Sequence, residues 1–434
     1  MPCPRGCQRG PGARPVRHRG CWRGPAGNHR GPGPIRLTSA ARSHRLHLMK
    51  ARGVHLQYSF QPEGQRGAEV QNPLFDLLWA VREHGSIQHA AKAMGASYRH
   101  VWGALKQWEE VMGEPLVTWT QGQPSRLTPF ADRLLWAETR ARTRLTPHIE
   151  ALRAELERVL AEALDGSQHV LPIYASHDLA LPLLRDLASQ QQRLHIELRF
   201  AGSVDALRAL AEGRCLVAGF HVPPLQGGAR VFAQALKPLL KPGRHKLIAF
   251  SRRAQGLMVA KGNPLQLRTV ADLAASVDGV RRPVRFIARQ AGSGTRLLMD
   301  HLLQQHGIAP EAITGYTSPP EDSHMAVAAA IASGVGDAGM GLAAAAQAFG
   351  LDFVPVMDED YFLVCLKDAL EHPAVLKLRE VLAGADWHQA VATLPGYSGA
   401  RSGEVLSLTG ALPWWNFRHP KHLPAGAAEH LPAG

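Results

Sequence analysis

The sequence predicts a multi-domain chain with an α-helical N-terminal part and an α/β part after it. Residues 73–164 carry the apolar spacing of helices, apart from a polar stretch with Gly and Pro at 113–129. Asp165-Gly166 ends that pattern. From residue 170 onward, short apolar runs alternate with helical stretches, which is typical of β-α-β units. We therefore expect a parallel sheet with helices packed on it.

The positive charge of the chain is concentrated at its beginning. The formal net charge is +13, but residues 1–48 hold ten Arg and no Lys, Asp or Glu, so subtracting ten leaves +3 for residues 49–434. Residues 1–48 are rich in Gly and Pro without apolar periodicity, and we expect them to be disordered. They could be a basic nucleic-acid arm or an artefact of start-site assignment; we favour the artefact, with Met49 as the true start. Net charge therefore does not argue for DNA binding here.

Composition excludes several classes of protein. Of 5 Cys, only Cys215 and Cys365 lie outside residues 1–48, so neither a disulfide framework nor a zinc-binding Cys pattern is present. The 22 His show no ligand spacing, and we expect no metal site. No apolar run is long enough to span a membrane, and no secretory signal is visible. These features predict a cytoplasmic protein without a membrane partner.

Residues 74–112 carry the turn and cap signals of three short helices. Gly85-Ser86 ends the first helix and caps the second. The small pair Ala90-Ala91 suits a close helix crossing, Gly95 supplies a tight turn, and Ser97 caps the third helix. This order predicts a helix-turn-helix unit.

In such a unit the start of the last helix enters the major groove of DNA. The residues expected at that end are Ser97, Tyr98, Arg99 and His100. The stretches PLVTW and RLT around QGQPS predict the two strands of a wing. Lys106 and Arg126 are candidates for phosphate contacts, with a solvated surface charge as the alternative for each.

The segment GSIQHAAKAMGASYRHVWGALKQWEEVMGEPLV, followed by SRLTPFADRLL, resembles the N-terminal domain of molybdate-responsive (ModE-type) and LysR-type regulators. The resemblance implies a winged helix-turn-helix domain over 49–132 and a linker or dimerisation helix over 133–166. Ala131-Asp132 stand where these families have Gly, which leaves the start of the linker helix uncertain.

The linker segment is amphipathic, and Pro147 is expected to kink or divide it. Its apolar stripe is Leu134, Leu135, Leu145, Ile149, Leu152, Leu156, Leu160 and Leu164. Because an apolar stripe must be buried, we expect a homodimer paired through this helix. Packing of the stripe on the chain's own DNA-binding domain is the alternative.

Three turns of the α/β part follow expected strands and begin expected helices: Ala175–Asp178, Ala201–Ser203 and Arg289–Arg296. Each offers free backbone N–H groups and hydroxyls at the positive end of a helix, a setting that suits an oxyanion. The third adds two arginines. Three such turns on one sheet predict an anion site.

The runs RFIARQAGSGTRLLMDHLL and EDSHMAVAAAIASGVGDAGMG resemble the periplasmic-binding-protein fold, in the molybdate/tungstate-type version fused to regulators and to some molybdopterin-biosynthesis proteins. The resemblance implies a two-lobed domain over 167–408, with a loose tail at 409–434, and places Asp337 near the cleft in a structural or hinge role. Ala288 replaces the family's Asn and removes a contact. The implied ligand residues are Ser176, Ser203, Arg289, Ser293, Thr295 and Arg296.

Together these features predict a DNA-binding transcription regulator that needs no cofactor and senses molybdate or tungstate. An organic anion or a molybdopterin-related ligand is the alternative effector, and a solute-binding transport component is a less favoured function. We do not expect an enzyme, because the consecutive Ser176-His177-Asp178 cannot ordinarily converge as a triad and no Gly-x-Ser-x-Gly elbow occurs.

Overall fold

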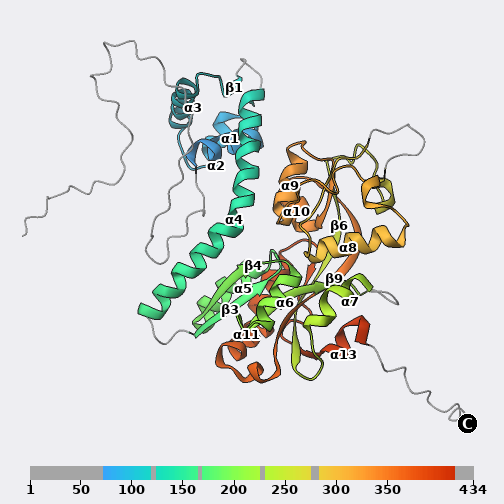
Figure 1. Ribbon diagram of the computed structural model, residues 1–434. Helices are drawn as coiled ribbons and strands as arrows, with labels where there is room; N and C mark the ends of the chain where they lie inside the picture. The colour runs from blue at the N-terminus through green and yellow to red at the C-terminus, as the bar shows by residue number, and fades with distance from the viewer. Residues whose placement is uncertain (1–71, 119–123, 165–168, 225–229, 275–282, 416–434) are drawn as a thin grey trace, which may run out of the picture. The chain divides into compact units, whose positions relative to one another are not determined.

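The structure is a computed structural model that describes residues 72–118, 124–164, 169–224, 230–274 and 283–415 (Figure 1). The segment expected to be disordered, 1–48, lies outside the described residues, as does the tip of the wing at 119–123.

Three helices form the N-terminal unit as predicted: α1 (Pro73–His84), α2 (Ile87–Ala93) and α3 (Tyr98–Met112). Gly85 ends α1 in the left-handed region at φ 60°, and the Ser86 hydroxyl accepts from the amides of Gln88 and His89. Ser97 caps α3 through the amide of His100. The short strands β1 (Val117–Thr118) and β2 (Arg126–Leu127) pair antiparallel as the wing.

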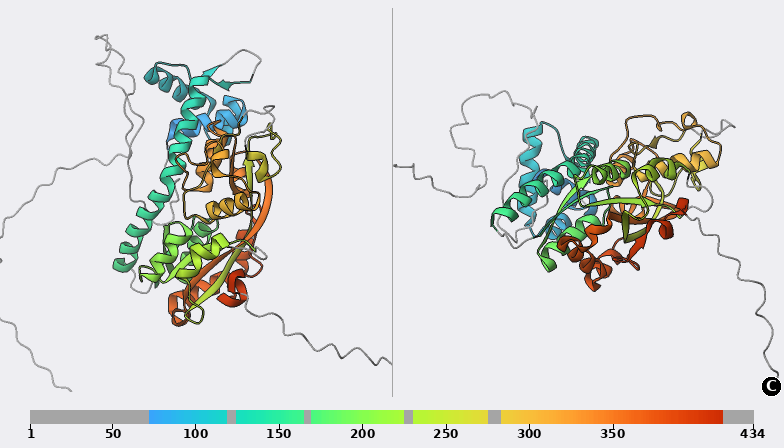
Figure 2. Two further views of the ribbon diagram at one scale, coloured as in Figure 1. Left: turned by 45° about the vertical axis from the view of Figure 1, so that its right-hand side comes forward. Right: turned by 60° about the horizontal axis from the view of Figure 1, so that its bottom comes forward.

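Helix α4 (Pro129–Leu164) is one element of 36 residues, drawn as a single long ribbon in Figure 2. Its start is fixed by the Thr128 hydroxyl, which accepts from the amide of Ala131 at 3.1 Å. Ala131 is fully buried, so a small residue other than Gly fits at this position. The expectation that Pro147 divides the helix is wrong, because the helix continues on both sides of it.

The α/β domain is built on one sheet of nine strands in the order β4-β3-β5-β9-β6-β8-β7, with two short strands paired to β6. Its strands are β3 (His169–Ala175), β4 (Leu194–Phe200), β5 (Val217–Val222), β6 (His245–Val259), β7 (Phe286–Ile287), β8 (Ala338–Leu342), β9 (Asp352–Leu366), β10 (Tyr397–Ser398) and β11 (Val405–Ser407).

The sheet is mixed, which corrects the expectation of a parallel one. β3 pairs parallel with β4 and β5, and β7 with β8, where helices connect consecutive strands. The long strands β6 and β9 are antiparallel to each other and run together through the domain (Figure 1). They join the β4-β3-β5 end of the sheet to the β8-β7 end, and so connect the two lobes of a periplasmic-binding-protein-like fold.

Helices cover this sheet and bury an extensive apolar core. They are α5 (Leu181–Gln192), α6 (Ser203–Ala211), α7 (Arg230–Leu236), α8 (Gly294–Gln305), α9 (His324–Ala332), α10 (Ala343–Ala348), α11 (Pro373–Ala383), α12 (Ala385–Ala392) and α13 (Leu408–Ala411), with short 3-10 turns at Lys237–Leu239, Val270–Leu273, Pro310–Ala312, Lys367–Glu371 and Pro413–Trp415.

The described part of the expected C-terminal tail is not loose. Leu412 and Trp415 are buried in the main core beside Leu408, so the folded chain extends beyond the predicted boundary at residue 408. Residues 416–434 lie outside the described residues.

Candidate functional site

Two of the three predicted turns meet in the structure, although they follow strands at opposite ends of the sheet. A Cβ built on Gly202, at the start of α6, would lie 3.1 Å from the carbonyl oxygen of Gly292, at the start of α8. The backbone N–H of Val204 points to the same oxygen at 3.5 Å. Close approach of the two backbones therefore depends on the missing side chain at residue 202.

A polar face lies beside this meeting point, on the strands β5, β9 and β6. The register pairs His221 with Tyr361 and Arg253 with Glu359. Gln255 is two residues from Arg253 and shares its face, because side chains alternate along a strand. We call the buried side chains gathered here, with those of the adjoining turns, the polar cluster: Ser176, Asp178, Ser203, His221, Arg253, Gln255, Arg289, Thr295, His324, Glu359 and Tyr361.

Arg253 holds two carboxylates inside this cluster. Its Nε donates to Glu359 Oε1 at 2.7 Å, and its Nη1 donates to Asp178 Oδ2. Asp178 also accepts from the amide of Ala180 and from the Tyr397 hydroxyl. Arg253, Asp178 and Glu359 are all fully buried or nearly so, and their charges compensate one another only in part.

Ser176 is bonded to His221 rather than to His177. The Tyr361 hydroxyl donates to the Ser176 carbonyl at 2.7 Å and accepts from the Ser176 hydroxyl at 3.3 Å. The Ser176 hydroxyl also lies 3.0 Å from His221 Nδ1, and the tautomer of the ring decides which of the two groups is the donor. Burial, followed by the charge of Arg253, holds the pKa of His221 well below its usual value.

Gln255 ties the start of α8 to strand β9. Its Nε2 donates to Thr295 Oγ1 and to Glu359 Oε1, both at 2.8 Å. Both amide protons are therefore used, and Gln255 Oε1 has no partner among the described residues.

Arg289 is the cation of the cluster that lacks a carboxylate hydrogen bond. It is buried, and its Nη2 donates to the carbonyl oxygen of Asp322 at 2.9 Å. Nε and Nη1 have no hydrogen-bond partner among the described residues. Burial lowers the pKa of Arg289 to about 10, against the smaller opposing effect of the Asp322 charge. An unpartnered, buried guanidinium edge is a feature that an anion would satisfy.

The buried histidines here are neutral for the same reasons. Burial and the charges of Arg289 and Arg253 lower the pKa of His177 to about 3 and hold that of His324 well below its usual value. His324 begins α9, where Ser323 caps the helix. A neutral ring can donate or accept one hydrogen bond at each nitrogen without adding charge.

The structure brings together five of the six predicted ligand residues: Ser176, Ser203, Arg289, Ser293 and Thr295. Ser203 Oγ is fully buried without a partner among the described residues, whereas Ser293 Oγ caps α8 and donates to the carbonyl of Gln290. Arg296 is placed elsewhere. Its Nε donates to Asp300 and its guanidinium lies 4.1 Å from the centre of the Tyr316 ring.

Sequence reasoning missed the strand residues of the cluster, namely His221, Arg253, Gln255, Glu359 and Tyr361. One signal was available in β6, where Ser251, Arg253 and Gln255 are polar at every second position between the apolar runs Leu247–Phe250 and Leu257–Val259. Polar residues at every second position of a buried strand indicate a polar face. Asp337 has the structural surroundings suggested for it, since its carboxylate accepts from the backbone and side chain of Arg285.

The predicted DNA-contacting residues form an exposed surface at the start of α3. Tyr98, Arg99 and His100 are exposed, and Tyr98 stacks on Trp102 with ring centres 6.2 Å apart. Lys106 is bound to Glu109 at 2.6 Å and lies over Trp102, while Arg126 is exposed on the wing.

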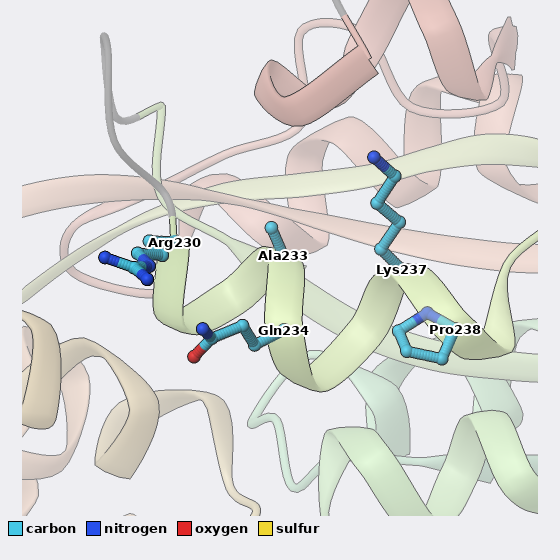
Figure 3. Close-up of a pocket in the computed structure, with 5 residues that line it drawn as sticks. All are labelled: Arg230, Ala233, Gln234, Lys237 and Pro238. Carbon is cyan, nitrogen blue, oxygen red and sulfur yellow. The ribbon is translucent and has the colours of Figure 1, made fainter.

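Other surface features lie away from the polar cluster. A shallow hollow on α7 is lined by Arg230, Ala233, Gln234, Lys237 and Pro238 (Figure 3), all from one continuous stretch of chain and therefore without convergent polar groups. In the described part of the chain, no three His, Cys, Asp or Glu side chains are placed to hold a metal ion. Within the same residues, no helix is long and apolar enough to cross a membrane.

Comparison with known families matches both parts of the chain. The family "Bacterial regulatory helix-turn-helix protein, lysR family" matches residues 74–132, and "PBP superfamily domain" matches residues 184–383. The protein "Uncharacterized protein YvgK" of Bacillus subtilis is 31% identical over 244 residues, which span 56% of this chain and 75% of that protein.

Solved structures of similar architecture include regulators and a binding protein. A mutant OxyR of Corynebacterium glutamicum with bound H2O2 has a TM-score of 0.36 at 16% identity, covering 72% of this chain and 94% of that one. A putative phosphate transporter substrate-binding protein of Clostridium perfringens has a TM-score of 0.41 at 14% identity, covering 53% and 99%. Scores below 0.5 do not extend the function of either protein to this chain.

Proposed function

This chain is a LysR-type DNA-binding regulator with a PBP-like domain and belongs to the family of YvgK, and on that premise we propose that its effector is a small oxyanion. The observation that carries the proposal is the buried edge of Arg289, whose Nε and Nη1 lack hydrogen-bond partners among the described residues. The helix starts of α6, α8 and α9 add positive ends near it, and Ser203 adds a free hydroxyl.

A compact ligand suits this site better than a bulky one. The close approach of Gly202 to Gly292 leaves little room between α6 and α8. The tyrosine ring of the cluster, Tyr361, is packed against Phe250 and is not an open stacking platform. Within the oxyanion class, the sequence resemblance gives molybdate and tungstate as first candidates, with an organic anion as the alternative.

The experiment is a thermal-shift screen of the chain with sodium molybdate, tungstate, sulfate and phosphate, followed by calorimetry. An anion that binds only the folded chain stabilises it by about 2.7 kcal/mol at 100 times its dissociation constant. A rise in melting temperature with at least one of the four is the expected result. No rise with any of them would refute the oxyanion effector and leave the DNA-binding role intact.

We propose Arg99 as the principal base-contacting residue, because it is exposed at the start of α3 and not held by a described ion pair. Arg99→Ala is expected to weaken binding to a duplex selected by the wild-type chain by about 1–3 kcal/mol. The matched control is Lys106→Ala, whose ammonium is held by Glu109 and should contribute less. Equal losses in fluorescence-anisotropy titrations of the two variants would contradict this assignment.

Helix α4 supports a proposed homodimer and a route for the signal. Leu145, Leu152 and Val159 are 37%, 49% and 51% exposed and stand seven residues apart. They form a stripe that a second copy would cover, as sedimentation analysis can test.

Arg144 of α4 donates to Glu321, next to the Asp322 carbonyl that accepts from Arg289. We propose that anion binding at Arg289 reaches α4 through this short path, in a chain that acts on DNA in the cytoplasm.

A further inference from the structure

The polar cluster contains hydrogen-bond acceptors without donors, which the oxyanion effector alone does not explain. Gln255 Oε1, Glu359 Oε2 and His221 Nε2 have no hydrogen-bond partner among the described residues. Glu359 Oε2 lies 3.9 Å from His221 Nε2, too far for a hydrogen bond. An oxyanion without protons offers only acceptors and cannot satisfy Gln255 Oε1 or Glu359 Oε2.

The two oxygens of Glu359 have different surroundings. Oε1 accepts from both Arg253 Nε and Gln255 Nε2, so these neighbours fix its position. Gln255 has no further amide proton to give, and no donor among the described residues lies within hydrogen-bond distance of Oε2. The carboxylate is therefore anchored on one side, while Oε2 is left free on the other.

We infer that Glu359 is the specificity-determining residue of this site, and that its free Oε2 selects an oxyanion that retains a hydroxyl, of the hydrogenphosphate class. The inference rests on the proposed function and reorders the candidates within it. The guanidinium of Arg289 takes the charged oxygens, and the effector's hydroxyl donates to Glu359. Sulfate, molybdate and tungstate carry no such hydroxyl near neutral pH.

The proton in this hydrogen bond can come from the effector's hydroxyl or from a protonated Glu359, and the two sources differ in their effect on affinity. Burial raises the pKa of Glu359 despite the opposing charge of Arg253. A proton-free anion binds best when Glu359 takes up a proton, and the free energy of that uptake subtracts from the anion's affinity. An effector that brings its own hydroxyl avoids that loss. The site therefore prefers a hydroxyl-bearing oxyanion by affinity, and a single substitution can reverse that preference.

That substitution is Glu359→Gln. Its amide oxygen can keep both bonds of Oε1, and its amide nitrogen then stands at the position of Oε2 as a donor. Calorimetry at pH 7.5 with sodium phosphate and sodium sulfate is expected to give at least about tenfold tighter phosphate binding to the wild type, the range of one charged hydrogen bond. In the variant, sulfate should bind more tightly than phosphate.

The control is Asp358→Asn, which removes the same charge one residue away, from a half-exposed carboxylate paired with Arg252. It should leave the phosphate preference unchanged. Equal affinities of the wild type for phosphate and sulfate, or the same change in both variants, would overturn the inference while the oxyanion effector stands. Failure of every anion in the screen would overturn both.

Should Glu359→Gln not melt cooperatively, Glu359→Asp provides the second test. The aspartate keeps the negative charge beside Arg253, but its side chain is shorter by one methylene group, so the free oxygen lies farther from the effector. Phosphate affinity is expected to fall at least about tenfold without a gain for sulfate. Unchanged phosphate affinity in this variant would overturn the role of Glu359.

Discussion

Replacing Arg289 with methionine is expected to abolish high-affinity anion binding and, in the same variant, to raise the melting temperature of the anion-free chain. The binding loss follows because the guanidinium is buried with Nε and Nη1 free for a ligand. Losing a buried charged partner costs about 2–5 kcal/mol, or roughly 30-fold to 4,000-fold in affinity. Calorimetric titration with phosphate and with molybdate measures it.

The expected gain in stability has a separate cause. Burial lowers the pKa of Arg289 to about 10, which shows that the folded chain holds this charge at a cost. Replacing a buried charge that has no hydrogen-bonded carboxylate with an apolar side chain of similar length removes this desolvation cost. A lower melting temperature in the absence of anions would contradict this account.

The matched control is the other arginine of the same motif. Arg296→Met removes a guanidinium that already bonds to Asp300 and lies over Tyr316. Phosphate affinity should stay within about fivefold of the wild type, because less than about 1 kcal/mol is expected from a charge away from the ligand. An equal loss in both variants would show that Arg296 is a ligand residue, as the sequence motif implied.

Replacing Gly294 with alanine is expected to destabilise the α/β domain and to impair anion binding. A Cβ at this position would lie 2.0 Å from His221 Nε2, in a fully enclosed place. His221 cannot turn away easily, because it is bonded to Ser176 and stacked on Tyr361. Forcing an extra methyl group into such packing costs about 1–3 kcal/mol.

Scanning calorimetry checks this result, since about 1 kcal/mol shifts the melting temperature of a domain of this size by about 2–4 °C. The control is Gly103→Ala in α3, where a Cβ meets nothing within 4 Å. That substitution should stabilise its helix by up to about 1 kcal/mol, since Gly is unfavourable in helices. A Gly294→Ala chain that melts and binds like the wild type would refute the close packing around His221.

Local signals account for the parts of the fold that the sequence predicted well. Gly85, Ser86 and Ser97 act on their own neighbours, through a left-handed turn or a hydroxyl that caps the next helix. Such effects are complete within a few residues and can therefore be recognised without a structure. The same holds for Ser293 at the start of α8.

The features of the sheet and site that the sequence did not predict depend on pairing between segments far apart in the chain. β9 continues through the charged run Asp358–Asp360, which local composition alone does not favour in a strand. It does so because Glu359 faces Arg253 across the sheet while Asp358 points outward to Arg252. Neither the antiparallel direction of β6 and β9 nor the meeting of Glu359 with His221 is visible in local spacing, so the strand half of the site was missed.

The contact between Gly202 and Gly292 also has a kinetic consequence. Ser203, Ser293 and Thr295 next to this contact are at most 2% exposed and Arg289 is 5% exposed, so an anion bound to them would be enclosed. Exchange of that anion would wait for the surrounding turns to open. The regulator would then register an average of the anion concentration over the interval between openings, and would ignore fluctuations that are shorter than that interval.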